Sequence, residues 1–261
     1  MEMLEALLFL MTGTLIGSFS ALLGIGGAVI LIPVLSLLFG LPIQMAMAIA
    51  LITNVAVSLS AVLKYERKGL LHRNAVKIMN IAAVPGIIAG IAISTNSPAS
   101  AIMILYGSFL LFMVALAFVN NKSKDREPIK EPEHIDRKGH SMLGFIIGIL
   151  CGALGLGGGG LAVSVQTNFF KTPIKNAIAN SMGTIAIAST IGAILYFMFS
   201  GTLFDAEEAL IITAMTVPGA VIGARISAGA ADMLKTKYIR YAFNLTLLYI
   251  AYSMITRGLG W

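Results

Sequence analysis

The chain has 261 residues, of which 57% are hydrophobic and only 11% are charged. Soluble globular proteins carry roughly a quarter charged residues, so this composition excludes an ordinary soluble domain. The net charge of +6 does not indicate nucleic-acid binding, because Lys and Arg collect in the cytoplasmic loops of membrane proteins. The single cysteine, Cys151, cannot form an internal disulfide, and we interpret it as a small buried residue.

In the first half, one long apolar run is followed by three runs of membrane-spanning length. The long run covers residues 4–39 and is broken by the glycines at 24, 26 and 27. The later runs cover residues 43–63, 75–93 and 99–119, and apolar stretches of about 18 or more residues predict transmembrane helices. No basic residue precedes the first run, so we interpret it as part of the mature fold rather than a secretory signal.

A polar connector separates this half from a second one with the same order of segments. The connector, residues 120–140, holds six Lys or Arg and five Asp or Glu. After it come an apolar run at 142–170, broken by glycines between 155 and 160, and runs at 174–199, 209–231 and 238–255. The sequence therefore predicts a first transmembrane repeat at 1–119, a cytoplasmic linker at 120–140 and a second transmembrane repeat at 141–261.

The two halves also match residue by residue. With a shift of 131, residues 24–58 and 155–189 have 11 identities in 35 positions without a gap, among them glycines, Phe39 with Phe170, and Pro42 with Pro173. With a shift of 133, Val84-Pro85-Gly86 falls on Val217-Pro218-Gly219. Ordered matches of Gly and Pro are hard to obtain from shared apolar composition, so we interpret the halves as internal repeats.

The charged loops predict how the repeats are oriented. Basic residues place the loops at 64–73, 120–140, 171–175 and 235–240 in the cytoplasm, whereas the loops at 94–98 and 200–208 lack basic residues and lie outside. The loop at 64–73 is inside while its counterpart at 200–208 is outside, so the repeats are inverted. We expect an all-α integral membrane protein with two inverted repeats, each a Gly-broken helical hairpin plus three transmembrane helices. Both termini then lie outside.

The glycine breaks are candidate anion sites. Non-helical backbone is tolerated at membrane depth only where protein or a water-filled cavity covers it. A helix that starts just after a break directs free N–H groups and a positive dipole end toward it. The alternative is close helix packing through small residues. The candidate substrate-binding glycines are Gly24, Gly26, Gly27, Gly155, Gly157, Gly158 and Gly159.

Polar side chains near the breaks are candidate ligands. Asn54, Asn180 and Thr184 are the preferred ones; the alternative for each is a hydrogen bond between helices. Arg225, inside a predicted span, could neutralise an anion or could extend to the membrane surface, and its repeat counterpart is Ala92. The sequence has no acidic residue deep in a span and no nucleophile–base pair, so we expect no enzyme activity, no cofactor and no metal site.

Two motifs resemble the TauE/SafE family of sulfite exporter-like permeases. They are GSFSALLGIGGAVILIP at 17–33 and GILCGALGLGGGGLAVSV at 148–165, accompanied by PGIIAG at 85–90 and PGAVIGAR at 218–225. The resemblance covers nearly the whole chain and implies a multi-pass permease of the inner (plasma) membrane. It implies export of a small sulfur-containing anion of the sulfite, sulfonate or sulfoacetate type. One departure is Ser164, which stands where the first half has Pro33.

The expected mechanism is alternating access around a site at the hairpin tips, near the membrane midplane. The expected partners are the small anionic substrate and the lipid bilayer, and no nucleic acid. Two alternatives stay open at this point. One is a transporter of a non-sulfur organic anion, and the other is a non-transporting membrane anchor or assembly subunit, which the short connector disfavours.

Overall fold

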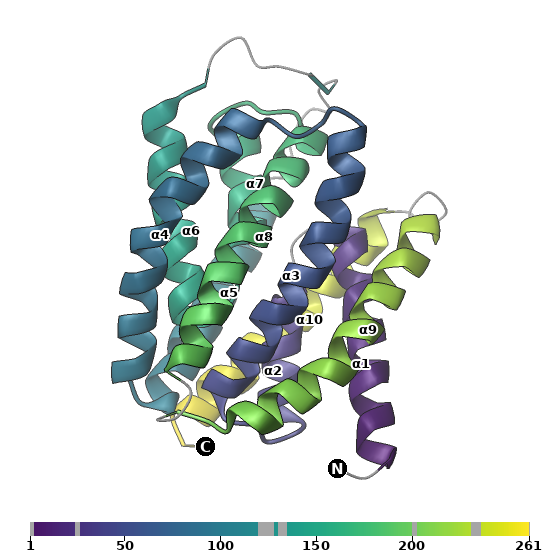
Figure 1. The fold of residues 1–261 in the computed structure, drawn as a ribbon, viewed down its shortest axis with the longest axis vertical. Coiled ribbons are helices and arrows are strands. Elements are labelled where there is room, and N and C mark those ends of the chain that lie inside the picture. Colours follow the sequence, from purple (N-terminus) through teal and green to yellow (C-terminus); the bar gives the residue numbers. More distant parts are fainter. Residues whose placement is uncertain are drawn as a thin grey trace.

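The computed structural model describes residues 3–23, 27–119, 128–129, 135–199, 203–230 and 236–260, and all regular structure in this part of the chain is helical. Connected antiparallel helices form one bundle (Figure 1). In the first half the helices are α1 (Met3–Leu23), α2 (Ala28–Leu37), α3 (Ile43–Arg67), α4 (Arg73–Asn96) and α5 (Ala99–Val119). In the second they are α6 (Arg137–Leu154), α7 (Gly159–Asn168), α8 (Ile174–Met198), α9 (Ala206–Ala230) and α10 (Thr236–Gly258).

The helix boundaries follow the repeat that the sequence predicts. A shift of 131 places both ends of α2 on the ends of α7, and both ends of α3 on the ends of α8. Pro42 and Pro173 are the N-caps of α3 and α8, where a residue without an N–H costs no helical hydrogen bond. Each half therefore contains two helices around a glycine break and three further helices.

The two arms of each hairpin differ in length: α1 has 21 residues and α6 has 18, whereas α2 and α7 have 10 each. At 1.5 Å per residue, α1 is about 31 Å long, comparable to the hydrocarbon core of a bilayer. The predicted linker also ends early, because α6 begins at Arg137. His140, expected in a loop, is buried in the first turn of α6 and stacks on Phe170.

Five helices of the described residues are long and apolar enough to cross a membrane: α3, α4, α5, α8 and α9. The helices α3 and α8 are the most enclosed of the five. They pack against each other, and each also contacts the short helix of its own hairpin. The second break and the start of α2 are thus held beside a central pair of long helices rather than at the lipid-facing surface.

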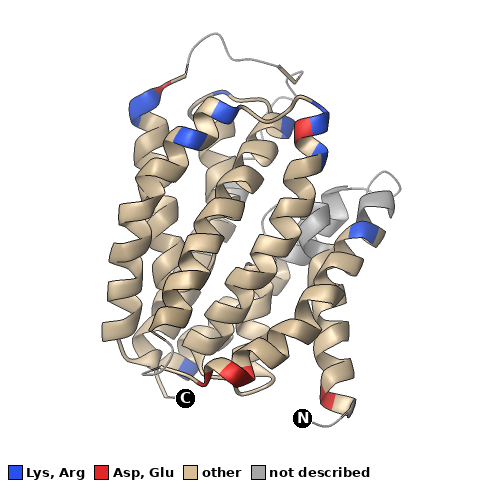
Figure 2. Cartoon of the chain, in the orientation of Figure 1, with Lys and Arg blue, Asp and Glu red and all other residues tan. Residues whose placement is uncertain are grey.

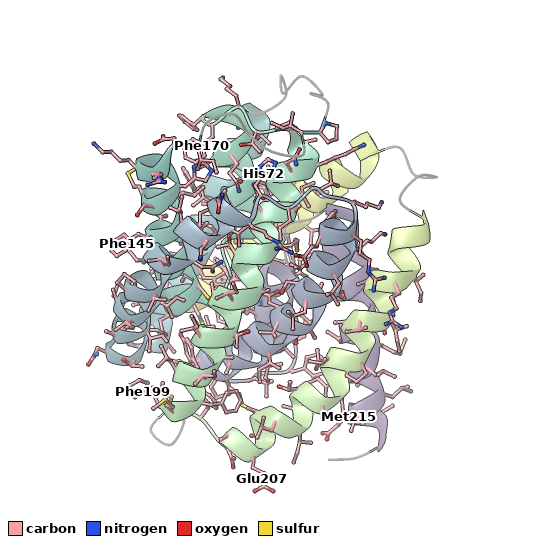
Figure 3. The ribbon with its side chains drawn as sticks, turned by 45° about the horizontal axis from the view of Figure 1, so that its top comes forward. His72, Phe145, Phe170, Phe199, Glu207 and Met215 are labelled. Atoms are coloured by element: carbon pink, nitrogen blue, oxygen red, sulfur yellow. The ribbon has the colours of Figure 1, made fainter. Side chains whose placement is uncertain are left out.

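Corresponding helices run in opposite directions through the bundle. In Figure 1, α3 leads to the end of the molecule at which α8 begins, and both chain termini lie at the opposite end. Lys and Arg gather at the end that carries the α3–α4 loop (Figure 2), and Glu207 lies at the other end from His72 (Figure 3). These directions and charges support the expectation of inverted repeats with the basic end in the cytoplasm.

Glycines let two helix pairs approach until their backbones touch. The pair α4–α6 contains Gly86, Gly90, Gly144 and Gly148, and a Cβ atom added at any of them would lie 2.1–2.4 Å from a backbone oxygen of the other helix. The pair α1–α9 contains Gly13, Gly17, Gly219 and Gly223, for which the same distance is 1.9–2.2 Å. Small residues at membrane-helix contacts permit this approach.

Candidate functional site

The second glycine break adopts a backbone conformation that favours glycine at three positions. Gly155, Gly157 and Gly158 have φ angles of +67°, +63° and +68°, in the left-handed region that costs other residues about 1–2 kcal/mol. Gly155 ends α6 by donating its N–H to the carbonyl of Cys151, and Gly158 is the N-cap of α7. The predicted break is therefore present, and it lies between α6 and α7.

Side chains from α3 and α8 close around this break. A Cβ atom added at Gly155 would lie 2.8 Å from the Cβ of Met47, and one added at Gly157 would lie 3.3 Å from Asn54 Nδ2 and 3.4 Å from Ser189 Oγ. The hydroxyl of Ser181 donates to the carbonyl of Gly159, the first residue of α7, at 3.1 Å. The break of the second hairpin thus lies against a helix of the first half.

The first break is described only from Gly27 onward, and the predicted site residues Gly24 and Gly26 lie outside the described residues. Gly27 is the N-cap of α2 and has right-handed angles, φ −69° and ψ −21°. It therefore differs from its counterpart Gly158. Neither glycine N-cap provides a side-chain hydrogen bond to its helix, so both helix starts keep N–H groups and a positive dipole end available.

Asn54 connects the two breaks. Its Oδ1 accepts a hydrogen bond from the backbone N–H of Ala28, the first residue of α2, at 3.4 Å. Its Nδ2 faces Gly157 in the other break, 3.3 Å from where a Cβ would be. The prediction that Asn54 belongs to a site shared by the two hairpin tips agrees with this position.

Two polar atoms beside Gly157 are buried without a hydrogen-bond partner. Asn54 and Ser189 are only 3% and 0% exposed, and neither Asn54 Nδ2 nor Ser189 Oγ has a partner among the described residues. A buried unpaired donor costs about 1–3 kcal/mol, so such atoms call for a functional or solvent partner. Counted along their helices, Asn54 is about 17 Å from the start of α3 and Ser189 about 22 Å from the start of α8, near the middle of each.

Cys151 lies beside the same two groups. Its thiol is fully buried, next to the backbone of Gly157 and the hydroxyl of Ser189, and it donates to the carbonyl of Ala188 at 3.5 Å. A thiol is a weak hydrogen-bonding group, so it leaves the Ser189 hydroxyl without a proper partner. Sequence reasoning treated Cys151 as a small buried residue and weighed Ser189 among the polar residues near the second break, but did not place it among the preferred ligands, although Ser189 matches Ser58 in the repeat.

Asn180 and Thr184 lie nearer the start of α8 than Ser189 does, and their hydrogen bonds are already made. Asn180 Oδ1 accepts from the backbone N–H of His72 at 2.8 Å, and its Nδ2 donates to Gln166 Oε1 at 3.0 Å. The hydroxyl of Thr184 donates to the carbonyl of Asn180 at 3.0 Å. Asn180 is about 13 Å along the helix from Ser189, so the structure brings Asn54, but not Asn180, to the break.

Arg225 lies on the surface of the bundle. Its side chain is exposed on α9, the helix that packs against α1. The break residues Gly157, Asn54 and Ser189 are instead buried between α3 and α8. This position favours the alternative in which the guanidinium extends to the membrane surface.

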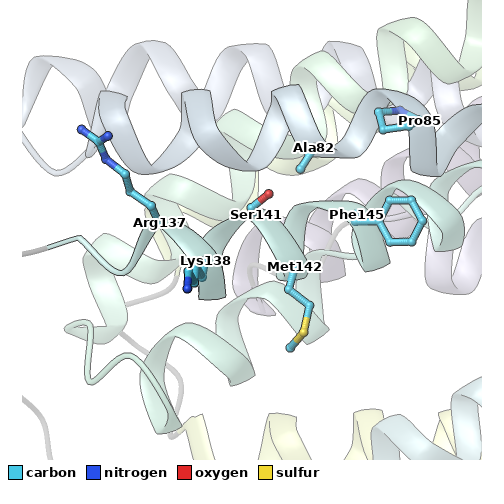
Figure 4. Close-up of a pocket in the computed structure, with 7 residues that line it drawn as sticks. All are labelled: Ala82, Pro85, Arg137, Lys138, Ser141, Met142 and Phe145. Atoms are coloured by element: carbon cyan, nitrogen blue, oxygen red, sulfur yellow. The ribbon is translucent and has the colours of Figure 1, made fainter.

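Two grooves of the described residues lie away from the breaks. One, of about 690 Å³, runs between α4 and α6 and is lined by Ala82, Pro85, Arg137, Lys138, Ser141, Met142 and Phe145 (Figure 4). Another, of about 470 Å³, lies at the acidic end between Glu5 and Glu207. Neither is lined by Asn54, Gly157 or Ser189, which are buried.

Comparison with known families decides the assignment. The family described as "Sulfite exporter TauE/SafE" matches residues 9–254. The chain belongs to the TauE/SafE family. No solved structure matches it.

Curated relatives of this TauE/SafE chain are named as transporters. It is 25% identical to "Probable membrane transporter protein YunE" of Bacillus subtilis, over 95% of this chain and 96% of that protein. It is also 25% identical to "Probable membrane transporter protein MamO" of Paramagnetospirillum magneticum, over 92% of this chain but 43% of that protein. The chain thus spans less than half the length of the MamO proteins. Family and relatives identify a multi-pass plasma-membrane protein of a transporter family, not an enzyme.

Proposed function

We propose that this chain is a permease that exports a small sulfur-containing anion of the sulfite, sulfonate or sulfoacetate type. One observation carries the proposal: Asn54 Nδ2 and Ser189 Oγ, buried and without a described partner, both lie beside Gly157 in the second hairpin break. The description of the matching family, a sulfite exporter, supports the choice of anion.

The proposed site suits an anion because its free groups are donors. Asn54 Nδ2 can only donate, Ser189 Oγ can donate, and the first turns of α2 and α7 present N–H groups. The positive dipole ends of these helices favour negative charge without a basic side chain. A sulfonate or sulfite group carries several acceptor oxygens around one sulfur, so several donors around one point match it.

The proposed mechanism is alternating access between the two repeats. In this conformation Asn54 and Ser189 are buried, so a bound anion would be occluded. Release to one side requires α3 with its hairpin to move relative to α8 with its hairpin, because Asn54 comes from the first repeat and Ser189 and Gly157 from the second. Relative motion of repeats around a midplane site is a recurring transporter design.

Ligand-dependent stability of the detergent-purified protein tests the substrate class. A ligand that binds only the folded state raises the melting temperature by mass action. We expect sulfite, thiosulfate, sulfoacetate or taurine to raise it, and acetate, phosphate and chloride not to. A shift with acetate alone would keep an anion transporter and discard the sulfur chemistry. Flux of the stabilising anion into proteoliposomes then tests transport itself.

Variants at the break test the site. Asn54→Ala removes one charge-assisted hydrogen bond to the anion, so we expect about a tenfold or larger loss of apparent affinity. Gly157→Val adds a side chain against Asn54 and Ser189 and should abolish flux while the protein stays folded. The matched control is Asn96→Ala, because Asn96 is exposed at the end of α4 and bonds only to nearby residues. Full flux in both Asn54→Ala and Gly157→Val would refute the site.

A further inference from the structure

The only cysteine of the chain is the one titratable or nucleophilic group described beside the unpartnered atoms of the break. Cys151 is on the last turn of α6, fully buried, and its thiol lies by the backbone of Gly157 and the Ser189 hydroxyl. The Asn54 amide nitrogen and the Ser189 oxygen, both more than nine-tenths buried, are free to bind a ligand at this point. A ligand that joins them occupies the space that the thiol borders.

We propose that the Cys151 thiol lines the anion path, faces the bound anion and contacts water each time the site opens. This inference rests on the proposed function. A thiol is compact and polarisable and gives only a weak hydrogen bond. Cys151 therefore forms a polarisable surface next to the stronger hydrogen-bond donors Asn54 and Ser189.

Alkylation tests this assignment without ambiguity, because the wild-type chain has one thiol. We would treat proteoliposomes with N-ethylmaleimide during sulfoacetate exchange and measure modified protein by mass spectrometry. We expect Cys151 to be alkylated, with a rate reduced at least several-fold by saturating sulfoacetate and unchanged by acetate. The matched control is Val114→Cys in a Cys151→Ala background, because Val114 is equally buried, on α5. Its alkylation should be slower and insensitive to sulfoacetate.

The possible outcomes test the position of the Cys151 thiol and the proposed permease function separately. If Cys151 is as unreactive as the control while sulfoacetate exchange proceeds, the thiol does not line the path, although the permease function stands. Alkylation that sulfoacetate does not slow would show that the thiol does not face the anion. Absence of exchange for every sulfur anion would overturn the proposed function itself. As a second measurement, Cys151→Leu should lose flux by about tenfold or more, and Cys151→Ser should lower the preference for sulfoacetate over acetate, with the melting temperature measured for both variants.

The groove between α4 and α6 carries a second, independent inference. Arg137 and Lys138 lie at one end of this groove and Phe145 and Pro85 farther along it (Figure 4). Both basic residues are exposed, and no ion pair is described for either in the resolved part of α6 and its neighbours. The nearby carboxylate of Asp136 accepts a hydrogen bond from the N–H of Gly139.

The repeat does not require this basic pair. The close contact of α4 with α6 has its counterpart in α1 with α9, built from matched glycines. At the positions that match Arg137 and Lys138, the first repeat has Ala6 and Leu7. The basic pair is therefore an addition at the end of the molecule where Lys and Arg gather (Figure 2).

We infer that this groove holds an anionic phospholipid of the cytoplasmic leaflet. Arg137 and Lys138 pair with its phosphate, and the apolar floor formed by Met142, Phe145 and Pro85 receives the upper acyl chain. From Arg137 to Phe145 the helix advances about 12 Å, which leads from the headgroup level into the hydrocarbon. Basic pockets between membrane helices on this side are typical headgroup sites.

Thermal stability in mixed micelles tests the lipid site. We expect phosphatidylglycerol to raise the melting temperature by several degrees relative to phosphatidylcholine, and Arg137→Ala with Lys138→Ala to lose most of this difference. The control with the same charge change is Lys64→Ala with Lys68→Ala, at the exposed end of α3 and in its loop. This double variant should keep the higher melting temperature in phosphatidylglycerol. Equal loss in both double variants, or no phosphatidylglycerol preference, would overturn the site. An equal shift from glycerol phosphate would replace the lipid with a free phosphate ester.

Discussion

The contact between α1 and α9 repeats the contact between α4 and α6 through matched glycines, whereas the polar groups at the two breaks repeat only in part. Gly13 and Gly17 match Gly144 and Gly148, and all four touch the backbone of the partner helix. At the breaks, Asn54 matches Ile185 and Cys151 matches Ser20. On the repeat hypothesis the packing glycines are kept in both halves, while Asn54 and Cys151 lie at positions where the halves differ.

The largest expected effect comes from the preserved glycines. In Gly17→Ala the new Cβ would lie 2.0 Å from the carbonyl oxygen of Ala220, and in Gly148→Ala it would lie 2.2 Å from that of Ala83. A backbone oxygen cannot rotate away, so each helix pair must separate, at a cost of about 1–3 kcal/mol or more. We expect both variants to lower the melting temperature and the monodisperse yield by similar amounts.

Gly192→Ala is the control for this pair, because its nearest new contact is the Cys151 sulfur at 3.3 Å. It should change stability far less than either interface variant. A severe effect of Gly148→Ala with none from Gly17→Ala would show that the two helix pairs are not equivalent, and would break the comparison between the halves.

The next effect distinguishes two asparagines. Asn180→Ala leaves the His72 N–H and the Gln166 side chain without their present partners, so we expect it to destabilise the fold by about 1–3 kcal/mol. Flux per folded molecule should change little, since Asn180 is away from the break. Flux and melting temperature measured on the same preparation separate the two contributions. A large loss of flux at full stability would restore Asn180 as a substrate ligand.

A smaller effect distinguishes two matched serines. Ser58 donates to the carbonyl of Asn54, whereas Ser189 Oγ has no partner. Ser58→Ala should therefore destabilise slightly, by about 0.5–1.5 kcal/mol. Ser189→Ala should leave stability unchanged or raise it, because it removes an unsatisfied buried group, and should still weaken anion binding. A stability loss at Ser189 without a change in binding would indicate that a bound water or a structural bond, rather than an anion, satisfies this hydroxyl.

The fold was more predictable than the site. Apolar length, the paired glycine breaks and Pro42 with Pro173 predicted the helices, because each of these features acts locally on the backbone. The partners of Asn180 and the free state of Ser189 were not predictable, because they depend on which helices meet in space. The repeat gave the one available signal for Ser189, its match to Ser58, and Gly27 departed from its own match because glycine accepts both signs of φ.

The smallest expected effect concerns Arg225, which is exposed on α9 and has Ala92 as its counterpart. The difference between the halves at this position makes Arg225 a candidate for binding the anion. Its exposed position favours the other role, in which the guanidinium extends to the membrane surface. The structure favours the second reading, so we expect Arg225→Ala to change apparent affinity for the anion by about twofold or less, within the range of a long-range charge effect in salt. Flux measured over a series of anion concentrations, beside Asn54→Ala, checks this. A loss as large as that of Asn54→Ala would place the guanidinium in the anion path during transport, in a conformation in which α9 has moved toward the break.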